Sequence, residues 1–359
     1  MMKATFLLWN INPKNFQKRL PHLINAMNGL IGEHRVNVIV LVECKKENAE
    51  ALQKGLNGTW TLVNDEDTGS IRVLTHLGLD LEITKLSING QQEFIQQGLR
   101  SQRYHLNQGE GNTIIDIDRR IRWFEIKSAS KHWTIFSVVH FYSKLDGAYA
   151  QKVNQVFTYT IRSILKESKS LNIDCGKVMI MGDFNLNPYE ELMYLNGKIE
   201  GDHLHTFPSR KSFYHLSKRH DHFFYNPMWL VMGDQRVESV ADYHPSRFRS
   251  NYTNLVVEKS KFELLKIKNY EKNYNILDGV LLAKDLVPYF EDRIWIKDSF
   301  MEHCSKKSLL NDDGLTLNKD LYSDHLPIIF ELDFSKEVSW QEKPRDGKSS
   351  RKSKKSKEV

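Results

Sequence analysis

The sequence predicts an α/β layered sandwich in which β-sheets carry helices on their outer faces. Strand-like apolar runs outnumber amphipathic helical segments, and several runs lack the polar alternation of a half-exposed strand, so we expect both of their faces to be covered. A doubly wound nucleotide-binding sheet is disfavoured, because no G-x-G-x-x-G motif opens a helix after the first strand and no G-x-x-x-x-G-K-[ST] motif is present.

The individual elements follow from the periodicity of apolar residues along the chain. The predicted strands are Thr5–Trp9, Val36–Val42, Trp60–Val63, Ile71–Leu74, Ile121–Ile126, Trp133–His140, Lys177–Met181, Ile276–Leu282 and Leu326–Leu332. The predicted helices are Phe16–Gly32, Asn48–Leu56, Ala148–Lys166 and Tyr189–Leu195. The first helix has apolar residues at helical spacing, which predicts one buried face.

Length and composition bound the class of protein. The chain has 359 residues, of which 40% are hydrophobic and 27% charged, which is enough for a sizeable core. No apolar run reaches the roughly 18 to 20 residues of a membrane span, and the N-terminus has the pattern of a first strand and not of a secretory signal. Three widely spaced cysteines favour a reducing compartment, so we expect a cytoplasmic protein without a membrane span.

Positive charge is concentrated near the C-terminal end of the sequence. The net charge is +6, and the segment from Gln341 to Val359 contains eight Lys or Arg residues and three acidic ones. This segment has almost no apolar residues to bury, so we expect residues 336–359 to form a disordered basic tail. Such a tail is usually just solvated, but it can also raise the local concentration of a polyanion. Residues 1–335 are expected to form one domain.

Six of the predicted strands have an Asn, Asp, Glu or His residue at one end. These residues are Asn10, Glu43, His140, Asp183 with Asn185, Asp278, and Asp324 with His325. Strands that share a core expose their ends along a common rim, so we expect these side chains to lie together. Carboxylates and an asparagine oxygen suit a hard cation such as Mg²⁺ or Mn²⁺, whereas a set without thiolates argues against a structural zinc site.

Taken singly, each of these residues also fits an ordinary turn, helix cap or core histidine. Together, the motifs WNIN, LVE, VVHF, GDFN, LDGV and SDHLP resemble the endonuclease/exonuclease/phosphatase superfamily, whose fold is similar to that of deoxyribonuclease I. All of them occur in the family's order, between residues 10 and 327. The resemblance implies one catalytic domain built as a four-layer α/β/β/α sandwich, with two packed mixed β-sheets flanked by helices. The VVHF histidine is typical of the deoxyribonuclease, sphingomyelinase and deadenylase branches.

The resemblance also implies roles for the rim residues. The implied ligands of the divalent cation are Asn10, Glu43 and Asp324. Asp183 would orient or deprotonate the attacking water, and Asn185, on the same face of an extended segment, would contact a phosphate oxygen or position the water. His325, oriented by Asp278, would meet the developing charge, and His140 would contact phosphate or protonate the leaving oxygen. Whether Asp183 or His325 is the general base stays open.

The long interval between GDFN and LDGV contains an expected insertion at about residues 201–270. Its aromatic residues are interleaved with Arg and Lys, a combination that could stack bases and grip phosphates. Equally, the aromatic residues could be the packing core of an inserted loop, with the cations on its wet face. The candidate substrate-binding residues, here and upstream, are Arg103, Tyr104, Asn226 and Trp229.

Together these observations predict a divalent-metal-dependent phosphoesterase. The expected function is hydrolysis of phosphodiester bonds in DNA or RNA by in-line attack of water, with Mg²⁺ or Mn²⁺ as cofactor and nucleic acid as partner. One alternative is a phosphatase or phosphodiesterase acting on inositol phosphates, nucleotides or phospholipid head groups. Another is a non-catalytic nucleic-acid-binding protein with the same fold.

Overall fold

The computed structural model describes residues 3–63, 69–101, 110–128, 133–143, 147–171, 173–186, 192–193, 204–210, 213–214, 223–231, 277–311 and 317–336. Several predictions lie outside these described residues. They are the substrate contacts Arg103 and Tyr104, most of the helix Tyr189–Leu195, most of the insertion at 201–270, and the basic tail beyond residue 336.

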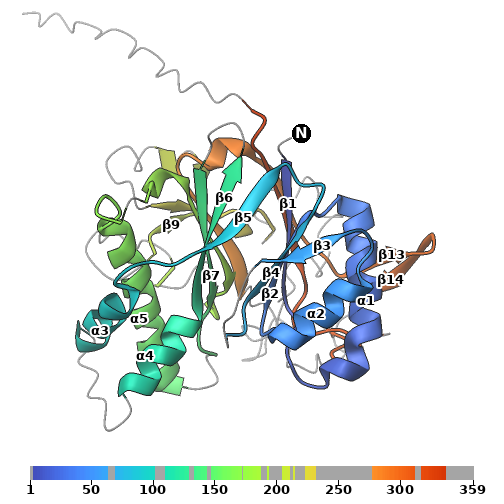
Figure 1. Ribbon diagram of the computed structural model, residues 1–359, viewed down its shortest axis with the longest axis horizontal. Coiled ribbons are helices and arrows are strands. Elements are labelled where there is room, and N and C mark those ends of the chain that lie inside the picture. The colour runs from blue at the N-terminus through green and yellow to red at the C-terminus, as the bar shows by residue number, and fades with distance from the viewer. Residues whose placement is uncertain are drawn as a thin grey trace, which may run out of the picture.

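Two mixed β-sheets form the centre of the molecule (Figure 1). The six-stranded sheet has the order β12 (Phe290–Ile296), β15 (Ile328–Asp333), β1 (Lys3–Asn10), β2 (Val38–Val42), β4 (Arg72–His76), β3 (Trp60–Leu62). The seven-stranded sheet has the order β5 (Leu81–Leu86), β6 (Ile121–Ser128), β7 (Trp133–His140), β8 (Val178–Asp183), β11 (Asp278–Ala283), β10 (Phe224–Tyr225), β9 (Thr206–Phe207). A separate hairpin joins β13 (Ser299–Glu302) to β14 (Ser305–Ser308).

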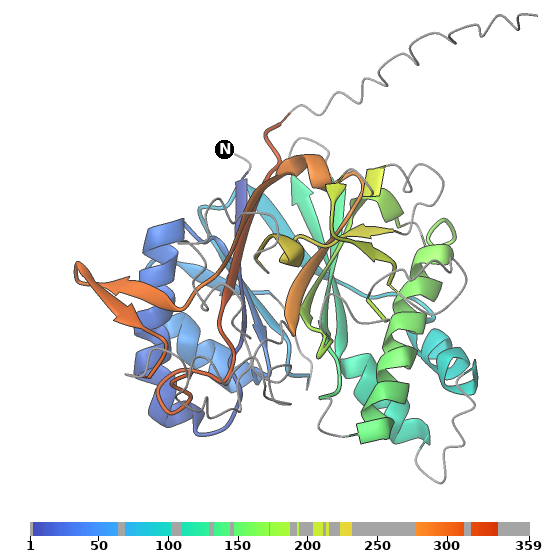
Figure 2. The ribbon, with the colours of Figure 1, turned by 180° about the vertical axis from the view of Figure 1, so that it is seen from behind.

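The two sheets pack face to face, and helices cover both outer faces (Figures 1 and 2). In the central core, Phe6 stacks on Phe330 at 4.7 Å within one sheet and meets Phe136 of the other sheet edge-on at 6.2 Å. Helices α1 (Phe16–His34) and α2 (Lys46–Gly55) share a second core with the six-stranded sheet. Helices α3 (Gln91–Ser101), α4 (Glu110–Arg119) and α5 (Gly147–Lys166) flank the seven-stranded sheet and share a third core with it. The predicted four-layer sandwich is therefore confirmed.

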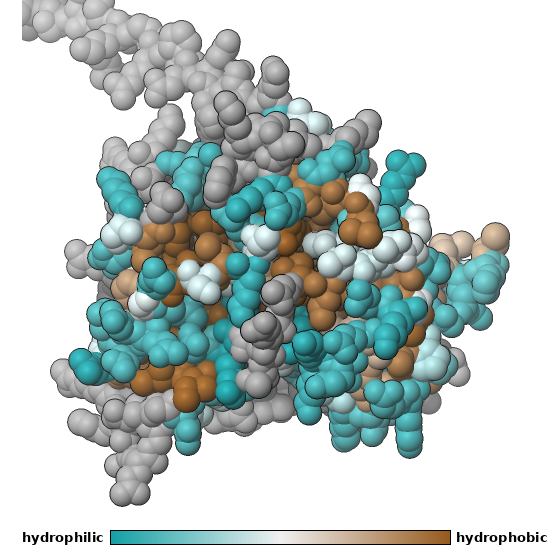
Figure 3. Space-filling view, in the orientation of Figure 1, coloured by the Kyte–Doolittle hydropathy of each residue, from teal (hydrophilic) through white to brown (hydrophobic). Residues whose placement is uncertain are grey.

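Each predicted strand overlaps an observed one, but several observed elements were not predicted. These are α3, α4, β5, β9, β10 and β12 to β14, together with the one-turn helix α7 (Met228–Val231) and two 3₁₀ turns at Cys175–Lys177 and Val287–Tyr289. Hydrophilic and hydrophobic side chains are interspersed on the face shown in Figure 3. Within the described residues, no helix has the length and apolar character needed to cross a membrane.

Candidate functional site

Three neighbouring strands of the seven-stranded sheet bring the first part of the site together. His140 at the end of β7 pairs with Asp183 at the end of β8, and Asp183 pairs in turn with Asp278 at the start of β11. Gly182 permits this close approach: its φ is +137°, and a Cβ at this position would lie 2.0 Å from the carbonyl oxygen of Val139. Three of the predicted residues therefore lie side by side across the sheet.

The six-stranded sheet contributes Asn10 and Glu43 from the ends of the parallel strands β1 and β2. The Nδ2 atom of Asn10 donates to Glu43 Oε1 at 3.0 Å and to Asp183 Oδ2 at 3.1 Å, so it bridges the two sheets. The Oδ1 atom of Asn10 accepts the backbone N–H of Asn12 at 3.1 Å. In this orientation Asn10 is a hydrogen-bond donor to the carboxylates, and ligation of a cation by its oxygen requires the amide to rotate.

Glu43 and His140 form the outer carboxylate–imidazole pair of the site. His140 Nε2 lies 3.3 Å from Glu43 Oε1, and the side chains are 12% and 27% exposed. Burial alone would raise the pKa of the Glu43 carboxyl, but the hydrogen bond and charge of His140, helped by Asn10, lower it to about 2. Glu43 is therefore a carboxylate at neutral pH, at a position that solvent can reach.

Asp278 and His325 form the inner pair. His325 Nδ1 donates to Asp278 Oδ2 at 2.6 Å, and the side chains are 4% and 2% exposed. Burial alone would lower the pKa of His325, but the Asp278 carboxylate raises it to about 10 through its charge and hydrogen bond. The backbone of His325 is also fixed in place, since Trp9 Nε1 donates to its carbonyl oxygen at 2.9 Å.

Asp183 lies between the two pairs and is buried. Burial first, and the nearby charge of Asp278 second, raise the pKa of its carboxyl to about 7. One ligand atom from each of Glu43, His140 and Asp183 lies within 4.8 Å of the others, and the same holds for Asp183, Asp278 and His325. Carboxylates crowded in this way repel one another, and a divalent cation would relieve that repulsion, so the donor set fits a hard metal ion.

Asn185 differs from the expectation of an extended segment. Its φ is +48°, so the chain turns there, and its N–H donates to Asp183 Oδ1 at 2.9 Å. Its side chain Nδ2 donates to the carbonyl oxygen of Phe141 at 3.0 Å. Asn185 therefore orients the Asp183 carboxylate and ties β8 to the residue after His140. The turn arises because Asn tolerates the left-handed conformation better than most residues.

Two residues that the sequence analysis missed, Asn12 and Arg19, connect the segment after Asn10 to the SDHLP segment. Asn12 Nδ2 donates to Asp324 Oδ2 at 3.0 Å. The guanidinium of Arg19, only 2% exposed, donates to the carbonyl oxygens of Ile11, Asn12, Lys14 and Tyr322. One buried side chain thus fastens the loop after Asn10 to the loop before Asp324.

The remaining predicted contacts lie beside the start of β11. Asn226, fully buried, accepts the N–H of Met228 at 3.0 Å through Oδ1, and Trp229 is half-buried in α7. A Cβ on Gly279 would lie 3.3 Å from the Met228 side chain, so α7 packs next to the residue that follows Asp278. Cys44, directly after Glu43, is buried, and burial raises the pKa of its thiol, which fits a packing role.

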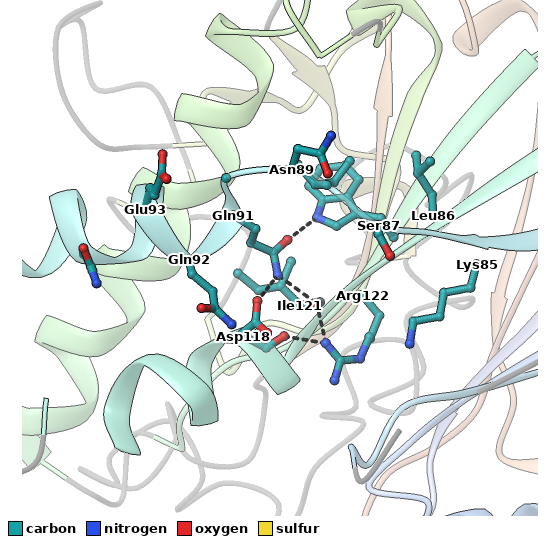
Figure 4. A pocket seen from close by; sticks show the side chains of 14 residues that line it. Lys85, Leu86, Ser87, Asn89, Gln91, Gln92, Glu93, Asp118, Ile121 and Arg122 are labelled. Carbon is teal, nitrogen blue, oxygen red and sulfur yellow. Dashed lines mark hydrogen bonds between the residues drawn. The ribbon is translucent and has the colours of Figure 1, made fainter. Parts of the chain in front are cut away.

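A pocket of about 520 Å³ lies elsewhere, at the start of α3 (Figure 4). Its polar groups bond one another: Gln91 donates to Asp118 at 2.7 Å and accepts from Trp123 Nε1 at 2.8 Å. None of the predicted site residues that the structure describes lines this pocket. The candidate site is therefore defined by the strand ends and not by this cavity.

No protein-family model matches the chain, and no curated protein matches it. Among solved structures, humanized TDP2 of D. rerio is similar over 93% of this chain and 100% of its own, with 12% identity and a TM-score of 0.49. A mannosyl-6-phosphatase of Bacteroides thetaiotaomicron is similar over 92% of this chain and 100% of its own, with 12% identity and a TM-score of 0.48. An endonuclease/exonuclease/phosphatase family protein of the same organism is similar over 92% and 97%, with 10% identity and a TM-score of 0.47.

At these identities the likeness concerns the fold. The four-layer sandwich is visible in the chain itself, and its strand ends carry the expected residues in sequence order from Asn10 to His325. On these grounds the chain resembles, in fold, the endonuclease/exonuclease/phosphatase superfamily.

Proposed function

We propose that the chain is a divalent-cation-dependent phosphoesterase that hydrolyses phosphodiester bonds in DNA or RNA. The observation that carries the proposal is the meeting of two carboxylate–imidazole pairs, Glu43–His140 and Asp278–His325, around Asp183. The set contains no thiolate, and the hydroxyl of nearby Ser323 donates to the Asn10 carbonyl. Direct attack of water on phosphorus, without a covalent enzyme intermediate, is the reaction that such a set supports.

Glu43 would hold the cation beside Asp183, together with the Asn10 oxygen once its amide has rotated. Asp324, tied to Asn12 on the neighbouring loop, would complete the cation side of the site. When bound, a divalent cation polarises the phosphoryl group and neutralises charge on its oxygens.

The proposed roles of the other residues follow from their protonation. A carboxyl with a pKa of about 7, such as that of Asp183, can take up or release a proton near neutral pH, which suits a group that orients and deprotonates the attacking water. His325, kept protonated by Asp278, brings a positive charge to the place where negative charge develops on the phosphoryl oxygens. His140 is placed to contact phosphate or to protonate the leaving oxygen.

The test is hydrolysis by the wild type and by Asp183→Asn, each with Mg²⁺, with Mn²⁺ and with EDTA. Substrates are single- and double-stranded DNA, RNA, a chromogenic phosphodiester and a chromogenic phosphomonoester. We expect cation-dependent diester cleavage by the wild type, reduced at least about a hundredfold in Asp183→Asn. Glu82→Gln, an exposed acid on β5 far from the site in the sheet, is the matched control and should retain full activity.

Hydrolysis of the monoester alone would move the proposal to a phosphatase. Cation-independent cleavage, or a phosphorylated enzyme intermediate isolated during turnover, would refute the mechanism. Binding of nucleic acid without any cleavage, equally strong in the wild type and in Asp183→Asn, would favour the non-catalytic alternative.

A further inference from the structure

Two tyrosines and an arginine lie together beside His140, and we call Arg120, Tyr142 and Tyr149 the tyrosine–arginine platform. The backbone N–H of His140 donates to the carbonyl oxygen of Arg120 at 2.9 Å. Tyr142 follows His140 by two residues in the sequence, and Tyr149 lies in the first turn of α5. The platform is therefore joined through its backbone to the end of β7, where His140 of the candidate site lies.

The side chains of the platform are arranged for stacking. The Arg120 guanidinium lies over the ring of Tyr142, with its central carbon 4.1 Å from the ring centroid. The ring of Tyr149 meets that of Tyr142 edge-on, at a centroid distance of 5.8 Å and an interplanar angle of 85°. Asp116 fixes both partners, because it accepts the Tyr142 hydroxyl and lies 3.4 Å from Arg120 Nε.

The backbone of Tyr142 is anchored by helix α5. The side chain of Asn154, buried on α5, accepts the Tyr142 N–H at 2.8 Å and donates to the Tyr142 carbonyl at 3.0 Å. Tyr142 is thus held by α4 through Asp116 and by α5 through Asn154. Contacts of this kind fix the ring before any ligand arrives, which lowers the entropic cost of binding one.

The platform presents aromatic surface to solvent. Tyr149 is 40% exposed, whereas Tyr225, in the central core, is 1% exposed. The charge of Arg120 is balanced by Asp116, which itself remains 42% exposed at the side chain. The platform therefore offers a stacking surface with little net charge, which suits a planar ring better than a phosphate group.

We propose that the tyrosine–arginine platform stacks a nucleobase of the substrate next to the phosphate bound at the candidate site. This inference rests on the proposed function and narrows its substrate class to phosphoesters that carry a base. Sugar phosphates and lipid head groups have no π-system that could stack on the platform as a base does.

The test measures binding of a short single-stranded oligonucleotide to the full-length protein in EDTA, by fluorescence anisotropy. A second oligonucleotide has the same phosphates but abasic sugars. We expect the wild type to bind the base-bearing strand more tightly, and Tyr149→Ala to lower the ratio of the two affinities about tenfold, a typical effect of losing one stacked base. Tyr149→Phe, which keeps the ring, should restore the ratio.

Two controls separate stacking from charge and from folding. Arg119→Ala removes an exposed arginine adjacent in sequence to Arg120, and Leu77→Ala removes an exposed apolar side chain before β5. Neither should change the ratio, whereas Arg120→Ala should lower it. If Tyr149→Ala leaves the ratio of the two affinities unchanged, including through an equal loss of affinity for both strands, the proposal of base stacking is refuted.

The binding assay needs no turnover, so the two proposals can fail separately. If no substrate is hydrolysed but the base-bearing strand binds in a Tyr149-dependent way, the platform stands and the phosphoesterase proposal fails. If diesters are hydrolysed and the ratio of the two affinities does not depend on Tyr149, only the proposal of base stacking fails.

Discussion

The two carboxylate–imidazole pairs contain the same two functional groups but differ in their surroundings. In the Glu43–His140 pair, which we call the open pair, the atoms are 3.3 Å apart and the side chains are 27% and 12% exposed. In the Asp278–His325 pair, the closed pair, the atoms are 2.6 Å apart and the side chains are 2% and 4% exposed. A carboxylate and an imidazole thus occur together once within reach of water and once almost completely buried.

The difference in burial determines whether the members of each pair can exchange partners. An ion pair near solvent contributes little to stability, because water can replace either partner, and so it can exchange its partner for a cation or a substrate. A buried pair has no such replacement, and removal of one partner leaves an uncompensated charge in the interior. The open pair is therefore suited to binding, and the closed pair to holding a charge in place.

Breaking the closed pair is expected to have the largest effect on the free energy of unfolding. Asp278→Asn should lower the free energy of unfolding by about 3–5 kcal/mol, because the protonated His325 then loses its buried counter-charge. Urea denaturation of the metal-free protein at pH 7 measures this, with Glu82→Gln as a control that should change by no more than about 0.5 kcal/mol. A loss below about 1 kcal/mol would show that the inner pair is not a buried ion pair.

Loosening the two loops that Arg19 joins near the open pair should have a smaller effect on the free energy of unfolding. Arg19→Met should lower the free energy of unfolding by about 2–4 kcal/mol, since two buried and two partly buried carbonyl groups lose their donor. It should also weaken Mn²⁺ binding about tenfold, because the loop after Asn10 and the loop before Asp324 are no longer tied together. Isothermal titration gives the affinity, and Arg100→Met, at an exposed position on α3, is the control. Lower stability with unchanged Mn²⁺ affinity would restrict Arg19 to a structural role.

The part of the fold that the sequence predicts best is the part that forms the site. Strands such as β2 and β8 are buried throughout, so they stand out as unbroken apolar runs, and the polar residue that ends each run stands out with them. The missed edge strand β5, LEITKL, is half exposed and alternates, and β12 carries acidic and basic residues among its apolar ones. Helix α3 is amphipathic, with Ile95 and Leu99 buried four positions apart, but its apolar residues are few among the glutamines and are easily overlooked.

Arg19 illustrates the limit of prediction within the site. Its partners are backbone carbonyls, which leave no pattern in the sequence. A signal was nevertheless available, because Arg19 occupies the same face of α1 as the buried residues Phe16 and Leu23, three positions before it and four after it. An arginine on the apolar face of a helix must find buried acceptors, and here it finds them in two loops of the site.

Removing the carboxylate of the open pair should barely affect stability. Glu43→Gln should change the free energy of unfolding by less than about 1 kcal/mol, because the side chain is partly exposed and the amide can still accept from Asn10. Diester hydrolysis should nevertheless fall by about a hundredfold or more, since a proposed ligand of the cation is lost. Urea denaturation and the chromogenic diester give the two values. A destabilisation as large as that of Asp278→Asn would show that the open pair contributes as much to stability as the closed pair.

The two pairs should also have opposite pH dependences. The folded protein raises the pKa of His325 from 6.5 to about 10, so its contribution to the free energy of unfolding is complete below pH 6.5 and disappears as the pH rises through 10. It lowers the pKa of Glu43 from 4.5 to about 2, so that contribution is complete above pH 4.5 and disappears as the pH falls through 2.

The pH windows can be measured by urea denaturation of the metal-free wild type and variants at several pH values. The stability difference between wild type and His325→Gln should shrink from pH 7 to pH 10, and the smaller difference for Glu43→Gln should shrink from pH 4.5 to pH 2. The difference for Glu82→Gln, near zero throughout, controls for general charge effects. If both differences shrank only in acid, His325 would be neutral in the folded protein. The closed pair would then be a hydrogen bond to a neutral ring, with no charge to offer a phosphoryl group.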